Sequence, residues 1–249
     1  MKNKSQHITN IFKPILDFIS DLFFPPMCCI CNESARLISQ PHGVQINLGG
    51  NSFESPFCPA CSKRLEKAYG PWLRKAGAGK QGAYYLFDYS DETVKRAIRH
   101  IKTCKCSQCR RFFAKAAEEC LDRLVADGST LTYIPRSRKL YDKYEFDQSR
   151  CILQEYLKLG KNAHFAEIFL RNAGKFNNAP QKSLNYKQRF ENARSSLLLI
   201  PNCKLPLSVV VFDDIITTGA TADTAAVLLY SANVNSVKMF FLAEAPLIK

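Results

Sequence analysis

Two adjacent carboxylates, Asp213 and Asp214, come directly after the apolar run Val209–Phe212. A strand of consecutive Val and Phe residues is covered on both faces, as in a parallel sheet packed between helices. In open α/β sheets, ligands bind beyond the carboxyl ends of the strands, so we expect both carboxylates at a ligand site. Placing two like charges side by side raises the cost of ionising both, which a purely structural loop does not need.

The residues that follow supply hydroxyl groups and a glycine where a helix is expected to begin. They are Thr217, Thr218, Gly219, Ala220 and Thr221. Amide groups and the helix dipole favour an anion at a helix N-terminus by up to ~2 kcal/mol, and hydroxyls add donors. Carboxylates beside such a cradle fit a ligand with vicinal hydroxyls near a phosphate, such as a ribose 5-phosphate. The alternative is a helix-capping Thr loop beside a surface Asp pair, but the complete pattern favours the ligand site.

Two C-x-x-C pairs, Cys28/Cys31 and Cys58/Cys61, have the spacing of a zinc site. Four thiolates suit tetrahedral zinc, and each pair can direct two sulfurs at one ion. The segment between the pairs is expected to form a turn or hairpin. Metal binding contributes on the order of 10 kcal/mol to a module too small for its own core. Buried thiols without a metal are the alternative, Cys29 is a spare thiol, and His42 is a weaker candidate ligand.

A third cysteine group consists of Cys104, Cys106 and Cys109. Such a triplet could bind a second metal or respond to oxidation. Three ligands fall short of the four that a structural zinc site needs, so we interpret these residues as free thiols. Cys120 is a candidate for the missing ligand, because the same helix would carry it.

The segment from Val94 to Lys115 carries eight Lys and Arg residues and no acidic residue, in a chain of net charge +13. On a helix, Ala97, Ile98 and Ile101 would pack inward, while Lys95, Arg99 and Lys102 would share an outward face. That face could bind a nucleic-acid backbone, where phosphate contacts dominate. The more common interpretation is an ordinary solvated helix face.

The elements that position these groups alternate between strands and helices after about residue 83, which predicts a parallel α/β sheet flanked by helices. The expected strands are Ala83–Tyr89, Thr130–Ile134, Glu167–Asn172, Leu207–Asp213 and Val237–Glu244, the last of which closes the sheet. The expected helices are Glu92–Thr103, Ser107–Ala126, Ser149–Leu159 and Ala220–Ser231. Polar sequence of weak periodicity runs from Ala173 to Arg194.

The Gly-rich stretch Lys75–Ala83 predicts a linker, which divides the chain into residues 1–83 and 84–249. The first part combines the zinc-binding module with an N-terminal amphipathic segment, since Lys13, Asp17 and Asp21 would line one helix face. The charges interrupt any apolar region that a signal peptide or a membrane span requires. We therefore expect a cytoplasmic protein without integral membrane insertion.

The run Val209–Thr221 resembles the signature of the type I phosphoribosyltransferases, which bind phosphoribosyl pyrophosphate (PRPP) together with magnesium. The resemblance implies that Asp213 and Asp214 contact the ribose hydroxyls and that the Thr217–Thr221 loop holds the 5-phosphate. Arg136 and Arg138 follow Pro135 at another expected strand end. They are candidates for pyrophosphate contacts, because guanidinium groups bind phosphate oxygens in a fork.

The opening LFFPPMCCIC, the second C-x-x-C pair and the C-terminal loop together resemble the ComF/GntX family of competence-associated, phosphoribosyltransferase-like proteins. That family's Arg-Gly-Phe-Asn-Gln block appears here as YEFDQ, with Tyr144 and Glu145 at its basic and glycine positions. Its later Gln, Leu, Arg and Asn are matched by Gln181, Leu184, Arg189 and Asn192.

The resemblance implies a PRPP-binding protein of competence or DNA uptake and processing, with single-stranded DNA or DNA-processing proteins as partners. Two alternatives stay open. One is an active nucleobase phosphoribosyltransferase of nucleotide salvage, which would release pyrophosphate. The other is a regulator that senses PRPP without turnover.

Overall fold

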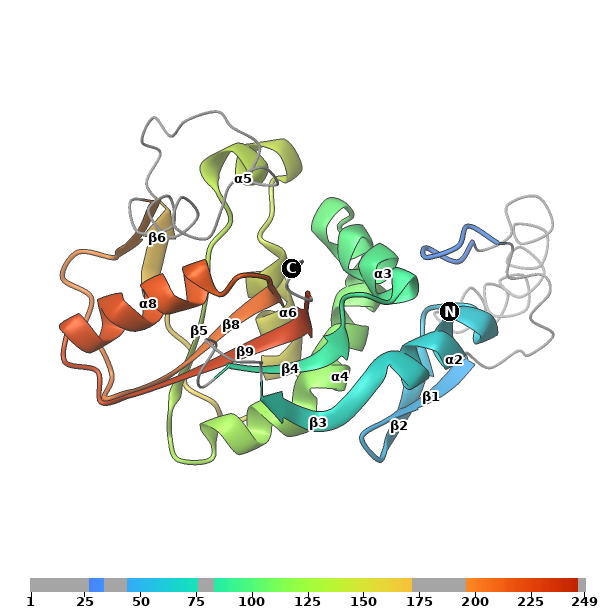
Figure 1. The fold of residues 1–249 in the computed structure, drawn as a ribbon, viewed down its shortest axis with the longest axis horizontal. Helices are drawn as coiled ribbons and strands as arrows, with labels where there is room; N and C mark the ends of the chain where they lie inside the picture. Colours follow the sequence, from blue (N-terminus) through green and yellow to red (C-terminus); the bar gives the residue numbers. More distant parts are fainter. Residues whose placement is uncertain (1–26, 34–43, 76–82, 172–195, 246–249) are drawn as a thin grey trace, which may run out of the picture.

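The computed structural model describes residues 27–33, 44–75, 83–171 and 196–245, the last residues of β3 by their backbone alone (Figure 1). Several expectations lie outside the described residues. These are the amphipathic N-terminal segment, His42, the linker apart from its ends, the polar stretch Ala173–Arg194, and Gln181, Leu184, Arg189 and Asn192.

The centre of the molecule is a five-stranded sheet in the order β3-β4-β9-β8-β5. Its strands are β3 (Tyr69–Lys75), β4 (Ala83–Asp88), β9 (Ser236–Glu244), β8 (Ser208–Ile216) and β5 (Thr130–Tyr133). Strands β4, β9, β8 and β5 are mutually parallel, and β3 is antiparallel to β4 at one edge. The expected mixed α/β architecture with a largely parallel sheet is confirmed.

One position in the sheet differs from expectation. β9 does not close the sheet but lies in its middle, between β4 and β8. Residues Met239–Ala243 of β9 are all buried, because helices cover both faces of the strand and β4 and β8 pair with its two edges. Likewise, the expected strand at Glu167–Asn172 forms as β6 (Phe169–Arg171), but it pairs with β7 (Leu197–Leu199) in a separate antiparallel sheet.

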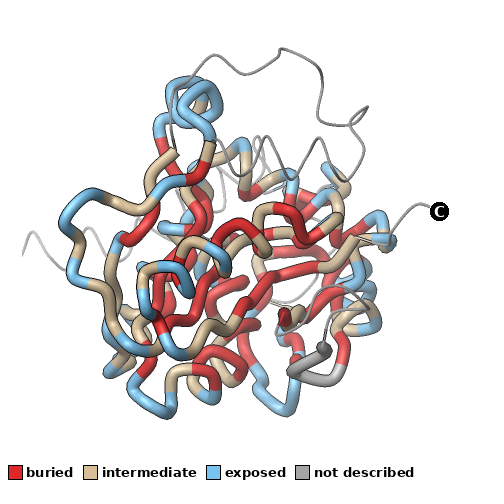
Figure 2. The backbone as a smooth tube through the Cα atoms, turned by 60° about the vertical axis from the view of Figure 1, so that its left-hand side comes forward, coloured by how far each residue is buried: buried red, intermediate tan, exposed pale blue. Residues whose placement is uncertain are grey.

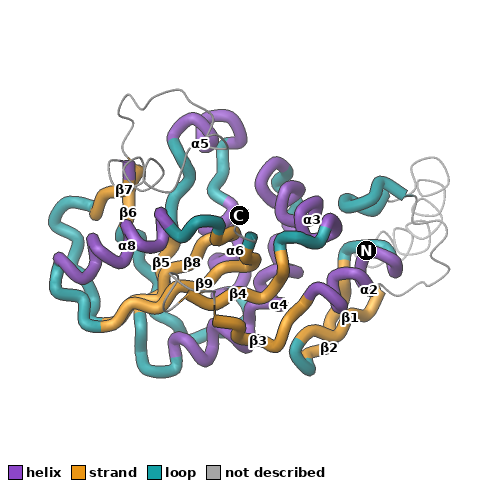
Figure 3. Tube along the Cα trace, viewed as in Figure 1, coloured by secondary structure: helices purple, strands orange, loops and turns teal. Residues whose placement is uncertain are grey.

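Helices cover both faces of the sheet, as Figures 1 and 3 show. The predicted helices form within two residues of their expected ends, as α3 (Glu92–Thr103), α4 (Ser107–Val125), α6 (Gln148–Leu157) and α8 (Ala220–Ser231). A short helix, α5 (Arg138–Tyr144), was not predicted. It has no buried residue, so no apolar periodicity marks it in the sequence.

The two faces of β8 contribute to two hydrophobic cores. Val210 and Phe212 belong to a core with residues of α3, α4 and α6. Val209 and Val211 belong to a second core with residues of α8 and β6. Figure 2 shows the buried backbone concentrated in the interior, with exposed segments around it. This packing holds β8 firmly and leaves its carboxyl end to carry functional groups.

The N-terminal module consists of a hairpin and a helix, which confirms the expected turn between the cysteine pairs. The hairpin joins β1 (Val44–Leu48) to β2 (Asn51–Ser55) through Gly49 and Gly50, whose φ angles of 64° and 90° favour glycine. Helix α2 (Pro59–Ala68) follows and runs directly into β3. The rings of Phe53 and Phe57 lie 5.5 and 4.8 Å from that of Phe112 on α4. The module therefore shares one hydrophobic core with the sheet.

None of the helices in the described residues combines the length and apolar character needed to cross a membrane.

Candidate functional site

Asp213 and Asp214 lie near the carboxyl end of β8, beyond the end of β5. β5 pairs with β8 only as far as Phe212, whereas β9 continues beside β8 to Ile216. From Asp213 onward, β8 therefore has a ladder partner on one side alone. Asp214 is buried and Asp213 is partly buried, and their carboxyl groups have different partners. The pair is part of the strand, so its backbone position is set by the sheet.

The carboxylate of Asp214 is paired on both oxygens. Lys102 Nζ, from the last turn of α3, lies 3.0 Å from Oδ1, and Gln148 Nε2, at the start of α6, donates to Oδ2 at 2.6 Å. Burial disfavours a charged amine at Lys102, but the carboxylates of Asp214 and Asp213 outweigh it and leave the lysine pKa raised. The protein therefore places a cationic amine and an amide donor against the Asp214 carboxyl group.

The carboxyl group of Asp213 has weaker support. It accepts a hydrogen bond from the amide of Asp214 at 2.8 Å and one from Ser149 Oγ at 3.3 Å. Burial, together with the neighbouring Asp214 charge, raises the pKa of Asp213 to about 7, although Lys102 and Arg171 act in the opposite direction. Asp213 therefore titrates near neutral pH.

The Thr217–Thr221 loop leads from β8 into α8 and turns at Gly219. Gly219 has a φ of 85° and occupies the N-cap position of α8, which has no side-chain cap. The amide of Ala220 makes one long contact, of 3.5 Å, to Thr218 Oγ1. Within the described part of the chain, no residue accepts a hydrogen bond from the amides of Thr217, Thr218 or Gly219. This turn therefore presents donors and a positive dipole end that an anion can occupy.

Arg136 and Arg138 occupy different environments. The guanidinium of Arg136 donates to the backbone oxygens of Phe146 and Lys102, at 3.2 and 2.9 Å, and stacks on the ring of Tyr144. Arg138, at the start of α5, is exposed and pairs with Asp142 one turn later. Arg136 thus joins the α3 end to the α5–α6 connection, whereas Arg138 keeps a guanidinium that faces solvent.

The YEFDQ block supplies several of the groups that build this region. Glu145 has a left-handed backbone with a φ of 59°, a conformation that glycine adopts more readily. Asp147 caps α6 through the amides of Ser149 and Arg150, and its other oxygen accepts from the amide of Arg136 at 2.7 Å. Gln148 is the amide partner of Asp214. The block therefore positions the site even with its altered residues.

The basic face expected on α3 is reduced in the structure. The expectation that Lys102 shares an outward face with Lys95 and Arg99 is wrong, because α3 ends beside β8 and Lys102 reaches Asp214. Lys95 pairs with Glu92 at 3.5 Å, and Arg99 is exposed. Arg99 on α3 and Arg111 on α4 remain exposed basic residues of this segment.

The four cysteines of the two N-terminal pairs come together as expected. The sulfur atoms of Cys28, Cys31, Cys58 and Cys61 all lie within 4.8 Å of one another, and those of Cys31 and Cys58 are 3.7 Å apart. Amides turn toward the sulfurs, since that of Cys58 donates to Cys28 at 3.4 Å and that of Cys61 to Cys58 at 3.5 Å. Burial raises the pKa of Cys28, but backbone hydrogen bonds outweigh it and lower the value to about 7. Four convergent sulfurs with such support fit a metal ion.

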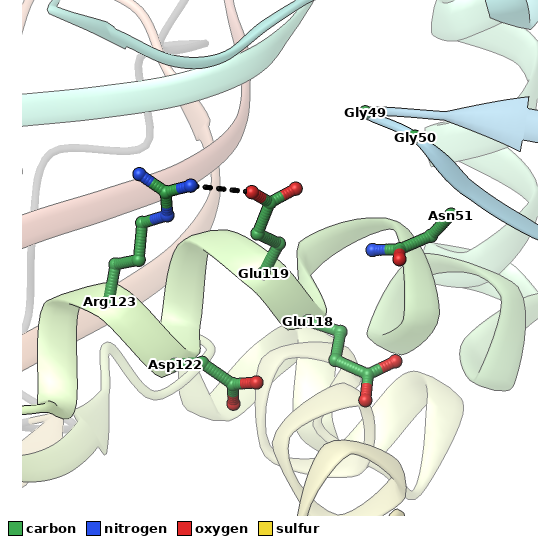
Figure 4. A pocket seen from close by; sticks show the side chains of 7 residues that line it. All are labelled: Gly49, Gly50, Asn51, Glu118, Glu119, Asp122 and Arg123. Atoms are coloured by element: carbon green, nitrogen blue, oxygen red, sulfur yellow. Dashed lines mark hydrogen bonds and ion pairs between the residues drawn. The ribbon is translucent and has the colours of Figure 1, made fainter.

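A cavity of about 460 Å³ lies elsewhere, between the hairpin turn and α4 (Figure 4). Its lining residues are Gly49, Gly50, Asn51, Glu118, Glu119, Asp122 and Arg123. Three acidic side chains against one arginine, which pairs with Glu119 at 2.8 Å, disfavour a phosphorylated ligand. The Thr217–Thr221 loop is therefore better suited to an anion than this cavity.

Sequence reasoning missed Lys102 and Arg171 as parts of the site. Arg171, on β6, is held by the backbone oxygen of Pro135 at 3.0 Å and by Ser196 Oγ at 2.9 Å. The positive charge of Arg171 acts against the rise in the pKa of Asp213. The spacing of Lys102 on α3 assigned it to the solvent face, and no local pattern marks Arg171.

No family model matches the chain, and no curated protein is significantly similar to it. Among solved structures, the chain is similar to adenine phosphoribosyltransferase from Saccharomyces cerevisiae, complexed with an imino-altritol bisphosphate and adenine. The sequence identity is 18%, the match covers 74% of this chain and 88% of that chain, and the TM-score is 0.34. A hypoxanthine phosphoribosyltransferase from Staphylococcus aureus gives 13% identity, coverage of 60% and 72%, and a TM-score of 0.31. Likenesses of this size carry no argument about activity, so the function rests on the chain's own residues.

Proposed function

We propose that this protein is a ComF-like member of the phosphoribosyltransferase group that binds PRPP with Mg²⁺. The observation that carries the proposal is the position of the Thr217–Thr221 loop. The amides of Thr217, Thr218 and Gly219 face no acceptor among the described residues, and the loop begins three positions after Asp214 at the same strand end. A ribose 5-phosphate would use both features at once, with its phosphate on the loop and its hydroxyls on the carboxylates.

The carboxylate pair suits hydroxyl donors. Lys102 pairs with Asp214, and Asp213 has a pKa of about 7. Both oxygens of Asp214 already have partners, so the ribose hydroxyls are expected to interact first with Asp213 and to share or replace the contact of Gln148.

The pyrophosphate of PRPP would lie toward α5, where Arg138 presents an exposed guanidinium. Arg136 stabilises the backbone of that region by donating hydrogen bonds to the backbone oxygens of Phe146 and Lys102. Mg²⁺ keeps most of its coordination from water and phosphate oxygens, so it needs few protein ligands here. From this placement we infer that Arg138 binds the pyrophosphate and that Arg136 holds α3 against the α5–α6 connection.

The four-cysteine cluster serves as a structural zinc site in this proposal. Sulfur ligands favour zinc over magnesium or calcium, and four protein ligands leave no open position for substrate. The zinc would stabilise the module that packs against Phe112 of α4.

A role in DNA uptake or processing adds single-stranded DNA as a partner, which would contact the exposed Arg99 and Arg111. Phosphate contacts there would weaken steeply with salt. Charge reversal of both arginines is expected to reduce binding of a labelled oligonucleotide, whereas Lys102 is unsuited to this test because it pairs with Asp214. If the charge-reversed variant binds the oligonucleotide as well as the wild type does at both a low and a high salt concentration, the DNA contacts another surface.

The direct test of PRPP binding is calorimetry with Mg²⁺ on the full chain. We expect the Asp213→Asn/Asp214→Asn double variant to lose most of the affinity, with Glu54→Gln on β2 as a control for the loss of one exposed carboxylate. Equal affinity in the wild type and the double variant would contradict the proposal.

Turnover is a separate question with its own measurement. The wild-type protein is incubated with Mg²⁺, PRPP and each common nucleobase, and pyrophosphate release is followed. Release with one base would identify a salvage transferase, whereas binding without release would leave the binding protein or PRPP sensor.

A further inference from the structure

Three metal-ligating side chains outside the four-cysteine cluster converge from distant parts of the chain. Cys29 comes from the first cysteine loop, His100 from α3 and Cys109 from the first turn of α4. One ligand atom from each lies within 4.8 Å of the others. The sulfurs of Cys29 and Cys109, which are 80 residues apart in the sequence, are separated by 3.3 Å.

Cys106 stands next to this group. Its sulfur lies 3.2 Å from that of Cys109 and accepts a hydrogen bond from the Cys109 amide at 3.4 Å. Cys106 is the N-cap residue of α4, so the C-x-x-C pair wraps around the start of a helix. Cys106 is outside the group whose ligand atoms all lie within 4.8 Å of one another, so its partly exposed side chain would have to turn toward a shared ion.

The same local geometry occurs in the four-cysteine cluster. Cys58 is the N-cap residue of α2, and its sulfur accepts from the amide of Cys61 at 3.5 Å. The two C-x-x-C pairs thus use the same device, in which a helix N-terminus turns two sulfurs to one side and stabilises their negative charge. This repetition distinguishes Cys106 and Cys109 from cysteines that are merely buried.

We propose that Cys29, His100, Cys106 and Cys109 form a second metal site, which takes a zinc ion in a three-sulfur, one-nitrogen environment. Zinc–sulfur bonds of about 2.3 Å place tetrahedral sulfurs about 3.8 Å apart. The observed separations of 3.2 and 3.3 Å are somewhat shorter, so ion entry requires only a small outward movement of the sulfurs. Thiolate and imidazole ligands select zinc over magnesium or calcium.

A disulfide explains the arrangement less well. It would use two of the three sulfurs and leave His100 without a role, whereas a metal uses all four groups. Cys109 is completely buried, and a metal ion would also use its sulfur, which solvent does not reach.

The structure also excludes the ligand that sequence spacing suggested. Cys120 lies eleven residues beyond Cys109 on α4, about 16 Å along the helix axis, and is not part of the group. Cys104 is also outside it, with its sulfur beside Thr103 Oγ1. Cys28 and Cys29 would therefore serve two different ions, which ties the first cysteine loop to both α3 and α4.

The test is the metal content of the purified full-length chain. The protein is produced with zinc and kept reduced, and the zinc-to-protein ratio is measured by plasma mass spectrometry. We expect two ions per chain in the wild type and one fewer in Cys29→Ser and in His100→Ala. Both residues are partly exposed, so these variants should remain folded, which circular dichroism checks. Cys104→Ser, outside the set on the same connection, should keep the wild-type ratio.

Cobalt substitution gives an independent readout. The spectrum of the cobalt-loaded wild type minus that of Cys29→Ser should show thiolate-to-cobalt charge transfer and the visible bands of a tetrahedral ion. Cys61→Ser tests the four-cysteine cluster separately, so failure of one site does not obscure the other. The proposal is overturned if wild type, Cys29→Ser and His100→Ala hold equal amounts of metal. A Cys29–Cys109 disulfide in the freshly purified protein would also overturn it. Neither result depends on PRPP binding.

Discussion

The ammonium group of Lys102 lies 3.0 Å from Oδ1 of Asp214, so the last turn of α3 is joined by charge to the end of β8. Removing the amine leaves a buried carboxylate with Gln148 as its remaining partner. We predict that Lys102→Met lowers the free energy of unfolding by about 2–3 kcal/mol. Urea denaturation measures the change.

A matched control comes from the same helix. Lys95 pairs with the exposed Glu92, so Lys95→Met should cost less than about 1 kcal/mol. Adding Asp214→Asn to Lys102→Met should recover part of the loss, because the unpaired buried charge is gone. Equal effects of the two lysine variants would contradict the buried pairing.

The titration of Asp213 should be visible in the pH dependence of stability. Its folded pKa is about 7, above the value of about 4 for an unfolded Asp. Between these values the folded protein keeps a proton that the unfolded chain releases. The stabilising contribution is therefore complete below about pH 4 and is lost as the pH rises through about 7.

The matching variant is Asp213→Asn, which cannot titrate. Its free energy of unfolding should fall less between about pH 5 and 7 than that of the wild type. Denaturation curves at several pH values give, for each protein, the slope of the free energy of unfolding against pH. Only these slopes are compared, because the substitution can also change stability by an amount that does not depend on pH. Parallel slopes would show that Asp213 titrates in its ordinary range.

The backbone at Glu145 gives a prediction that is independent of ligands. Its φ of 59° is unfavourable for a residue with a Cβ atom. We expect Glu145→Gly to stabilise the protein by about 1 kcal/mol, since glycine adopts this conformation readily. Thermal denaturation provides the measurement.

Glu145→Gln serves as its control, because it removes only the exposed pair with Lys105 and keeps the Cβ atom. It should change stability little. A gain of the same size in both variants would attribute the effect to charge.

The hydroxyl of Thr217 should contribute to phosphate binding, because this exposed side chain begins the loop with open amides. We predict that Thr217→Val, which keeps the side-chain shape, weakens PRPP binding about tenfold, or about 1.4 kcal/mol. Calorimetry compares it with Thr103→Val, an exposed threonine on α3. Identical dissociation constants for wild type and Thr217→Val would remove this hydroxyl from the site.

Metal removal should affect more than the N-terminal module. Phe57 packs against Phe112 at 4.8 Å, so the module and α4 share a core. We expect a strong chelator to lower the melting temperature of the whole protein, with a single transition in both forms. Calorimetric scans that show the module melting alone, with the main transition unchanged, would contradict this coupling.

Local patterns were sufficient to predict the helices and the strand that carries the aspartates. The apolar periodicity of Ala97, Ile98 and Ile101 placed α3 at its observed ends. The loop at Gly219 and the gathering of Cys28, Cys31, Cys58 and Cys61 followed from spacing. These features depend on residues that are close in sequence or on chemistry that permits few arrangements.

Features that depend on contacts between distant segments were not predictable. Strand order placed β9 in the middle of the sheet, and only the fold brings Lys102 beside Asp214. The polar helix α5 has no buried face, so it has no periodic signal. Cys29 was a spare thiol in the sequence, because its neighbours His100 and Cys109 come from two later helices.

The central position of β9 has a consequence for biosynthesis. β9 lies between β4, which emerges from the ribosome long before it, and β8, which ends at residue 216, twenty residues before β9 begins at residue 236. Until residues 236–244 have left the exit tunnel, each of these strands exposes an edge that its final neighbour will cover. Nascent chains are therefore expected to depend on chaperones late in translation, and the sheet forms as a unit only when its last strand inserts.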